Sequence, residues 1–145
     1  AELLKSRLRV TLDDKISRVR FLPAMSNKDY MNVMALADVS LDTRPFGGGN
    51  TSWQAIAAGT PVVTWPGAFL RGRYTQALYR LLGVTDAIAG SANQYIKLAV
   101  KFGTDRAFAE QYNRRVAEAA PSIFADNVHV DALYKFLVDQ VRSGI

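Results

Sequence analysis

Three consecutive glycines followed by small polar residues are the clearest sign of a ligand-binding site in this chain. The segment Gly47–Gly49 runs directly into Asn50, Thr51 and Ser52. Glycine has no Cβ, so the backbone can take positive φ and approach a ligand closely. The first N–H groups of a helix have no partner inside the helix, and the macrodipole places partial positive charge there. A glycine loop that opens into a helix therefore indicates an anion site, for a phosphate or a diphosphate.

A simpler interpretation of the same residues is a flexible turn, in which Asn50 or Thr51 only caps the helix. The pattern is not a P-loop, because no lysine follows the glycines, and no acidic residue stands where dinucleotide-binding folds hold the ribose. The position of the loop favours a ligand. It follows the carboxyl end of a predicted buried strand, where open α/β sheets bind ligands. The hydroxyl of Thr51 or Ser52 would then be an additional donor.

Short apolar segments and amphipathic segments alternate around this loop. We expect a strand over residues 38–43, a helix over 51–58 that ends at Gly59, and a second strand over 61–65. Strands that alternate with helices predict an α/β fold, a Rossmann-like parallel sheet with helices on both faces.

The remaining elements follow from periodicity and from helix-capping residues. Ser26 with Asp29, and Ser91 with Gln94, have the spacing of capping boxes. Further expectations are a helix over 2–9, a loop at 13–14, a strand over 18–23, a helix over 74–81 closed by Gly83, a weak strand over 86–89, a helix closed by Gly103, a helix over 105–120 broken by Pro121, and a final helix with Val130, Leu133, Leu137 and Val141 on one side.

Three or four strands are few for a complete doubly wound domain. The chain also begins inside a predicted helix, at Ala1. We therefore expect residues 1–145 to form one domain of a larger protein, without its first strand or strands.

Composition restricts the class of protein. The 145 residues are 49% hydrophobic and 21% charged, which is typical of a globular domain. There is no cysteine, in agreement with a cytoplasmic location, and no apolar run approaches the length of a membrane span. The net charge of +5 favours anionic partners, but the basic residues are scattered, so a nucleotide is expected as partner and nucleic acid is not.

Two long segments resemble the catalytic region of O-linked N-acetylglucosamine transferases, in particular their bacterial relatives. Within residues 21–67 the resemblance rests on the runs DVSLDT, FGGGNTS and AAGTPVVT, and residues 69–108 follow the same family pattern. The resemblance implies a glycosyltransferase of the GT-B type, with two Rossmann-like domains facing a cleft. This chain would be most of the carboxyl-terminal domain, which binds the nucleotide sugar.

The resemblance also implies an activity. The expected donor is a UDP-sugar, most often UDP-N-acetylglucosamine, and the expected acceptor is a Ser or Thr hydroxyl of a protein. The family needs no metal or other cofactor, and the chain has no D-x-D motif. The fragment alone is expected to be inactive, because the amino-terminal catalytic half and tetratricopeptide repeats would lie outside it.

Site residues carry over from the family position by position. Gly48–Thr51 match the segment that holds the diphosphate, and the turn at 23–25 matches the loop whose backbone meets the uracil. Tyr30 stands where a ring stacks on the base, although its place on an apolar helix stripe equally fits a core residue. The expected donor-binding residues are Ala24, Met25, Tyr30, Gly47, Gly48, Gly49, Asn50, Thr51, Ser52 and Gln54.

Three positions depart from the family. Gly49 replaces a histidine of animal members, Asn27 replaces a lysine, and Gln54 replaces a carboxylate that bonds the ribose hydroxyls. A neutral amide oxygen is a weaker acceptor than a carboxylate. These changes leave open a non-catalytic nucleotide-binding or protein-interaction module, or a related hexosyltransferase that uses UDP-glucose or modifies Asn.

No residue of the chain is assigned to catalysis. The single histidine, His129, lies between two valines near the final helix and is expected to be structural. Asp38 and Asp42 flank the first predicted strand and are expected to serve turns. Arg71 and Arg73 could assist a leaving diphosphate, but exposed helix charges are the simpler interpretation.

Overall fold

The computed structural model describes residues 2–124 and 127–144, and these are mainly helical. The α-helices are α1 (Glu2–Leu12), α2 (Asn27–Leu36), α3 (Asn50–Ala57), α4 (Tyr74–Leu82), α5 (Ala92–Thr104), α6 (Arg106–Ala119), α7 (Pro121–Phe124) and α8 (Val128–Arg142). Two 3₁₀ helices, η1 (Asp13–Arg18) and η2 (Leu70–Gly72), complete the helical elements of the described residues.

A short parallel sheet lies at the centre. Strand β1 (Ser40–Leu41) pairs with β2 (Val62–Val63), with Ser40 opposite Val62. Beyond β2, Thr64 forms a parallel bridge with Ile88, so the weak strand expected over 86–89 takes part as a single bridge. The order β1, β2, bridge is that of consecutive β-α-β connections, and it directs the carboxyl ends of all three segments to one edge.

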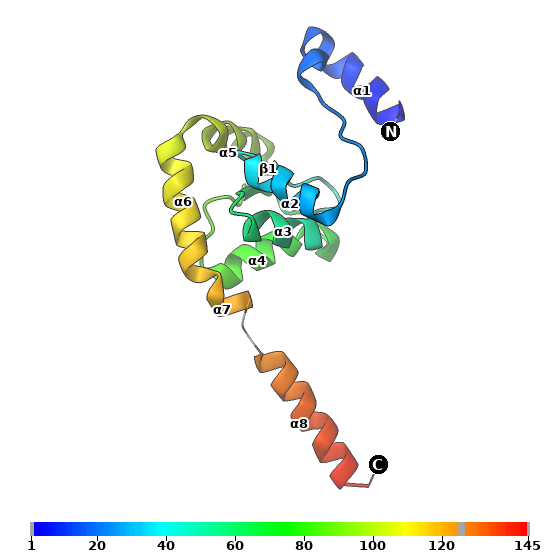
Figure 1. Ribbon diagram of the computed structural model, residues 1–145, viewed down its shortest axis with the longest axis vertical. Helices are drawn as coiled ribbons and strands as arrows, with labels where there is room; N and C mark the ends of the chain where they lie inside the picture. Colours follow the sequence, from blue (N-terminus) through cyan, green and yellow to red (C-terminus); the bar gives the residue numbers. More distant parts are fainter. Residues whose placement is uncertain (1, 125–126, 145) are drawn as a thin grey trace.

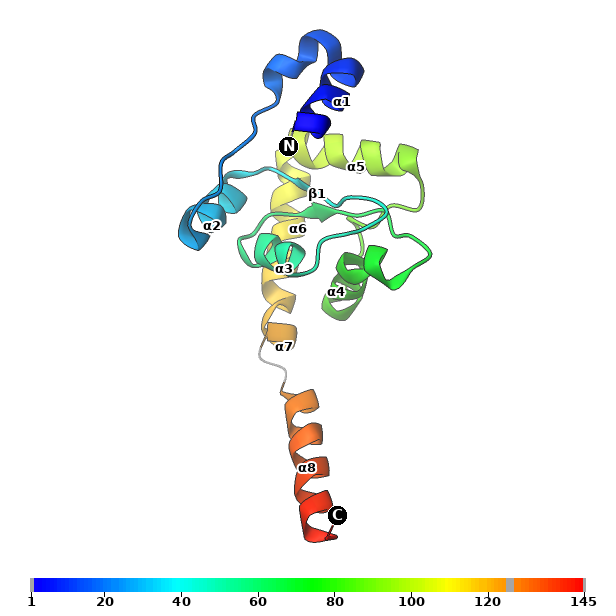
Figure 2. The same ribbon diagram turned by 90° about the vertical axis from the view of Figure 1, so that its right-hand side faces the viewer.

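Helices cover both faces of this sheet, as the sequence predicts. Figure 2 shows β1 between α5 on one side and α3 and α4 on the other. Helix α3 packs against β2 and α2, while α5 packs against β2 and α6. A loop over residues 42–49 connects the carboxyl end of β1 to the start of α3.

The core gathers around β2 and two tyrosines. Its buried members are Ala55, Ile56, Val62, Val63, Leu78, Tyr79, Leu82, Val84, Ala87, Phe102, Tyr112 and Val116. The Tyr79 hydroxyl accepts from the Val62 N–H at 2.7 Å and donates to the Val62 carbonyl at 2.9 Å. This side chain therefore satisfies both polar backbone groups of a fully buried strand residue. Burial raises the pKa of Tyr79 to about 12.

Three of the predicted helix ends are confirmed in detail. The Ser26 hydroxyl accepts a hydrogen bond from the Asp29 N–H at 3.1 Å and donates one to the Asp29 carboxylate at 2.7 Å. The Ser91 hydroxyl accepts from the Gln94 N–H at 3.2 Å. Gly83 ends α4 with a positive φ of 67°.

The strand expected over residues 18–23 is wrong. Residues 13–18, part of which was expected to be loop, form η1, and the chain then runs without regular structure to Ser26. An extended apolar segment becomes a strand only when a neighbour supplies hydrogen bonds, and among the described residues none pairs with it. Pro23 further removes one backbone donor.

Other predicted boundaries need smaller corrections. The two strands are shorter than expected, and α5 continues through Gly103 to Thr104. Pro121 does end the preceding helix, but it also begins α7, because proline fits the first turn of a helix, where no N–H partner is needed.

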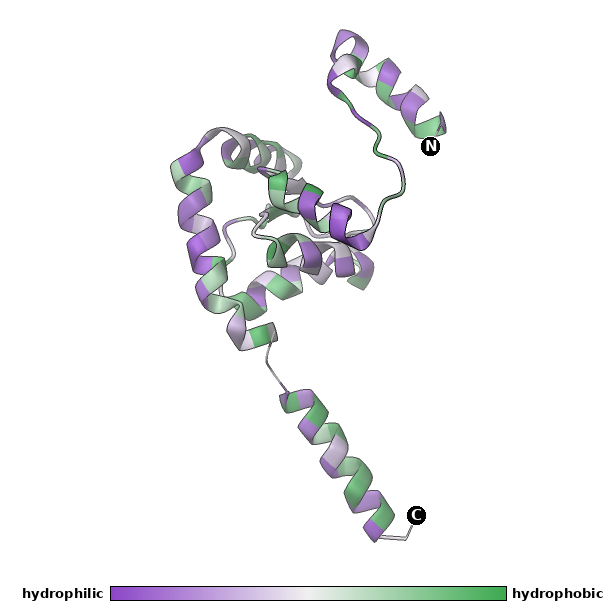
Figure 3. Ribbon diagram, viewed as in Figure 1, coloured by the Kyte–Doolittle hydropathy of each residue, from purple (hydrophilic) through white to green (hydrophobic). Residues whose placement is uncertain are grey.

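Helices α1 and α8 extend away from this body in opposite directions (Figure 1). The apolar side predicted for the final helix is present but exposed: Leu133 is 58% and Leu137 is 53% exposed. Figure 3 shows the apolar residues running along α8. The assignment of residues 1–145 to one domain stays a prediction.

We predict opposite outcomes for two buried tyrosines. Tyr79→Phe leaves the buried N–H and carbonyl of Val62 unpaired, and should lower the free energy of unfolding by about 1–3 kcal/mol. The Tyr112 hydroxyl is buried without a hydrogen-bond partner among the described residues. Tyr112→Phe should therefore be neutral or stabilising. Urea unfolding followed by circular dichroism measures both, and equal losses would contradict the assigned role of Tyr79.

Candidate functional site: a groove at the carboxyl ends of the strands

Two adjoining pockets, called together the groove, lie between α2 and the start of α3. Its larger part, called here the outer pocket, has a volume of about 570 Å³ and is lined by Pro23, Ala24, Met25, Asn27, Tyr30 and Gln54, among others. Its smaller part, called the loop pocket, has a volume of about 150 Å³ and is lined by Asp42, Thr43, Gly48, Thr51 and Ser52, among others. Tyr30 and Met34 line both pockets, so the two parts adjoin.

This groove brings together most of the predicted donor residues. The residues expected to meet a base and a ribose line the outer pocket, whereas only Gly48, Thr51 and Ser52 of those expected to meet phosphate line the loop pocket. Tyr30 is half-buried and lines both pockets. Gly47, Gly49 and Asn50 line neither pocket.

The glycine loop leaves backbone donors free at the start of α3. The Gly47 N–H donates to the Arg71 carbonyl at 2.8 Å, and the Ser52 N–H donates to the Gly49 carbonyl at 3.0 Å. Within the described part of the chain, the N–H groups of Gly49, Asn50 and Thr51 have no acceptor. Three unpaired N–H groups at a helix N-terminus can receive an anion.

The capping residues differ from the prediction. Gly49 is the N-cap of α3, with no side-chain cap, and Asn50 is already the first residue of the helix. The two candidate hydroxyls also differ. Ser52 is buried, and its hydroxyl shares a hydrogen bond of 2.7 Å with the Thr75 hydroxyl. Thr51 is exposed at the groove, so its hydroxyl is the one available to a ligand.

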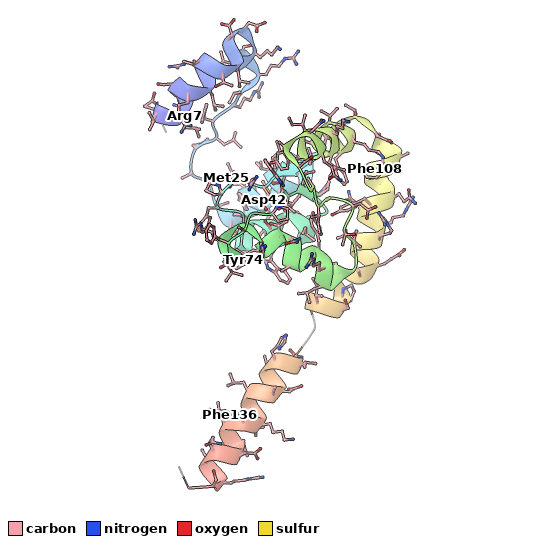
Figure 4. The ribbon with its side chains drawn as sticks, turned by 180° about the vertical axis from the view of Figure 1, so that it is seen from behind. Arg7, Met25, Asp42, Tyr74, Phe108 and Phe136 are labelled. Atoms are coloured by element: carbon pink, nitrogen blue, oxygen red, sulfur yellow. The ribbon has the colours of Figure 1, made fainter. Side chains whose placement is uncertain are left out.

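Asp42 holds this loop against the sheet. Its carboxylate accepts from the Gly48 N–H at 2.6 Å and from the Thr64 hydroxyl at 2.7 Å. The Tyr95 hydroxyl donates to the Asp42 carbonyl at 2.8 Å. Burial, together with the nearby Asp42 charge, raises the pKa of Tyr95. The hydroxyl therefore stays protonated and can donate this hydrogen bond. Figure 4 places Asp42 inside the body of the molecule, with Arg7 and Phe136 on the outlying helices.

The sequence assigned Asp42 only to a turn and missed this role. The available signal was its position: a carboxylate at the carboxyl end of a buried strand, directly before a glycine-rich loop. Asp38, which has the same predicted role, is exposed and lies outside the groove.

Two neutral amide side chains, Asn27 and Gln54, line the outer pocket. The Gln54 amide nitrogen donates to the Asn27 side-chain oxygen at 3.5 Å, a long and weak bond. Two of the positions that depart from the family pattern are therefore neighbours. The Gln54 carbonyl oxygen is still able to accept from a sugar hydroxyl.

The arginines near the loop have other partners. The Arg44 guanidinium lies 3.6 Å from the centre of the Trp65 ring, and Arg71 lies 4.7 Å from that of Phe69. The Arg73 Nε donates to the Gly67 carbonyl at 2.8 Å. His129 is exposed on α8 and lines neither pocket.

Residues 2–124 and 127–144 contain neither a candidate metal site nor a candidate membrane-spanning helix. They contain no group of three or more His, Cys, Asp or Glu that could hold a metal ion. They also contain no helix that is long and apolar enough to cross a membrane.

Comparison with known families identifies the chain. The model of "Glycosyl transferase family 41" matches residues 3–130, which is most of the sequence. The chain belongs to glycosyl transferase family 41.

Relatives in this family agree with the assignment. A probable UDP-N-acetylglucosamine–peptide N-acetylglucosaminyltransferase, SPINDLY, from Oryza sativa subsp. japonica is 34% identical over 89 residues, covering 61% of this chain and 10% of that protein. The UDP-N-acetylglucosamine–peptide N-acetylglucosaminyltransferase of Caenorhabditis elegans is also 34% identical over 89 residues, covering 61% of this chain and 8% of that protein. The chain thus spans about a tenth of the length of these relatives.

A solved structure shares the fold. A mutant O-GlcNAc transferase of Thermobaculum terrenum superposes with a TM-score of 0.75 and 30% identity, over 84% of this chain and 24% of that chain. The match confirms the predicted α/β class and the GT-B architecture. The family named from residues 21–108 is likewise confirmed.

We predict that two adjacent glycines respond differently to a methyl group. A Cβ at Gly48 would clash with the Ser52 hydroxyl oxygen and lie 2.7 Å from that of Thr51, whereas a Cβ at Gly49 would meet nothing within 4 Å. Gly48→Ala should lower the free energy of unfolding by about 1–3 kcal/mol through this crowding. Gly49→Ala is the matched control. Urea unfolding followed by tryptophan fluorescence compares them, and equal stability would show that the loop has more room than its geometry indicates.

Proposed function

We propose that this chain forms the donor-binding part of a protein O-glycosyltransferase. The whole protein would transfer N-acetylglucosamine from UDP-N-acetylglucosamine to a Ser or Thr hydroxyl. The observation that carries the proposal is the groove itself. It joins a wide pocket with an aromatic side chain, Tyr30, to a narrow one in which Gly48 and Thr51 meet the start of α3.

The parts of UDP correspond to the two pockets. The uracil would meet the backbone at Ala24 and Met25 and stack on Tyr30, and the ribose would reach Gln54. The diphosphate would accept hydrogen bonds from the free N–H groups of Gly49–Thr51 and from the Thr51 hydroxyl. Helix α3 would add its positive dipole end.

Such a site meets one of the two chemical needs of glycosyl transfer. The acceptor hydroxyl oxygen forms a bond to the anomeric carbon, the bond from that carbon to the diphosphate breaks, and the diphosphate leaves with the electron pair. Backbone N–H groups held in place stabilise the charge on the leaving group. The acceptor proton needs a base, which we place in the part of the protein beyond this chain. No metal or other cofactor is part of the proposal.

The proposal also includes the other parts of the whole protein and its location in the cell. The chain would act together with an amino-terminal catalytic half and tetratricopeptide repeats, in the cytoplasm, and would be inactive alone. A second candidate is a non-catalytic nucleotide-binding module or a UDP-glucose-dependent hexosyltransferase. The neutral Gln54–Asn27 pair supports it, because the resemblance places a carboxylate at position 54 and, in animal members, a lysine at position 27.

The first test is a calorimetric titration with UDP, beside UMP and inorganic phosphate, on this chain and on the longest natural protein that contains it. Saturable UDP binding that is much tighter than phosphate binding supports the donor site. Absence of UDP binding by the longer protein would reject it. Transfer of N-acetylglucosamine to a protein acceptor by the longer protein then separates the enzyme from the binding module.

We predict that Thr51→Val weakens UDP binding, because it removes the hydroxyl donor while preserving the shape of the side chain. One lost hydrogen bond to a charged acceptor corresponds to about 1.5–3 kcal/mol. The control is Thr104→Val, on α5, whose hydroxyl bonds the Val100 carbonyl far from the groove. Calorimetry with UDP measures both. Equal affinity of Thr51→Val and wild type would remove Thr51 from the phosphate site.

We predict that Gln54→Glu preserves or tightens UDP binding, because a carboxylate accepts hydrogen bonds from ribose hydroxyls more strongly than an amide does. The matched control is Gln111→Glu, an exposed position on α6 with the same change of charge. A clear loss of UDP affinity in Gln54→Glu alone would show that Gln54 has another function.

A further inference from the structure

Asp42 is the one carboxylate among the described residues that line the loop pocket. It is only 8% exposed, and both of its oxygens accept hydrogen bonds. These hydrogen bonds run to the loop at Gly48 and to the sheet side at Thr64. The geometry of Asp42 therefore supports a role in shaping the loop.

We infer that Asp42 is the positioning residue of the donor loop. Its carboxylate fixes the Gly48 N–H to the end of β1, so that the next three N–H groups are left free at the mouth of α3. This inference rests on the proposed function for the nature of the ligand. The anchoring itself is a property of the chain.

Contacts on both sides of the loop support this role. Gly47 packs against Asp42 so closely that a Cβ there would lie 3.0 Å from both carboxylate oxygens. On the sheet side, Thr64 donates to Asp42 and is itself tied by its backbone to Ala87 and Ala89. The loop is thus fastened through one side chain to all three segments of the sheet.

The charge of Asp42 is not what the loop needs. A buried anion beside a phosphate site opposes an anionic ligand, whereas the hydrogen bond to Gly48 can still be accepted, although more weakly, by an amide oxygen. In Asp42→Asn the Oδ1 atom can keep the Gly48 contact, and the Thr64 hydroxyl can rotate to accept from the amide. A geometric role therefore predicts rescue by Asn and loss with Ala.

The first measurement needs no ligand. Hydrogen exchange of the Gly48 amide, read by NMR, should be at least about tenfold faster in Asp42→Ala, because its acceptor is gone. It should stay near the wild-type rate in Asp42→Asn. Asp38→Ala removes an exposed carboxylate from the same segment and is the matched control. If Asp42→Ala does not fold, Thr64→Val removes the second partner of Asp42 and should change the exchange in the same direction. Unchanged exchange in every folded variant overturns the inference.

The second measurement is UDP binding and transfer by the longest natural protein that contains the chain. Asp42→Ala should weaken UDP binding by about tenfold, as expected for a lost ordering contact, and Asp42→Asn should bind UDP as tightly as wild type or more tightly. Asp42→Asn should also retain transfer. Loss of transfer in Asp42→Asn with intact UDP binding would make Asp42 a base and overturn the positioning role. If wild type binds no UDP, the proposed function fails, while the exchange experiment still decides whether Asp42 anchors the loop.

Discussion

The hydrogen bonds of one buried carboxylate connect the candidate site to the rest of the fold. Asp42 ends β1, accepts from Gly48 in the loop and from Thr64 beyond β2, and its carbonyl accepts from Tyr95 on α5. A buried charge is costly unless hydrogen bonds satisfy it. The loop, the sheet and α5 must therefore keep their relative positions, because a shift of the loop or the sheet would break hydrogen bonds to this carboxylate. These fixed positions determine the narrow shape of the loop pocket.

Local structure was predictable where a single segment determines it. The capping boxes at Ser26 and Ser91 and the positive φ at Gly83 depend on neighbours within a few residues, and the sequence shows them directly. The segment over 18–23 has the composition of a strand but lacks a partner among the described residues. Strand formation depends on contacts distant in sequence, so this error could not be avoided from composition alone.

The candidate site likewise contains residues that a local sequence pattern indicates and residues that only the fold brings together. The glycine loop was recognisable from its three consecutive glycines, and the structure shows that Gly48 has no room for a Cβ, whereas Gly49 has. Ala24, Met25, Tyr30 and Gln54 were assigned through family resemblance, and their meeting in one pocket requires the fold. Ser52 and Thr51 look equivalent in sequence, but only packing reveals that the Ser52 hydroxyl is occupied by Thr75. That these residues bind UDP stays a prediction.

Charge is distributed in a way that limits how the groove can hold an anion. The chain carries a net charge of +5, yet no lysine or arginine is found among the described residues that line the two pockets. Arg44 and Arg71 lie against aromatic rings, and Arg73 bonds a backbone carbonyl. A phosphate in the loop pocket would therefore depend on backbone N–H groups and the dipole of α3. Such donors are effective only when they are fixed before the ligand arrives. The rigidity that Asp42 gives the loop would then replace the positive side chain that this groove lacks.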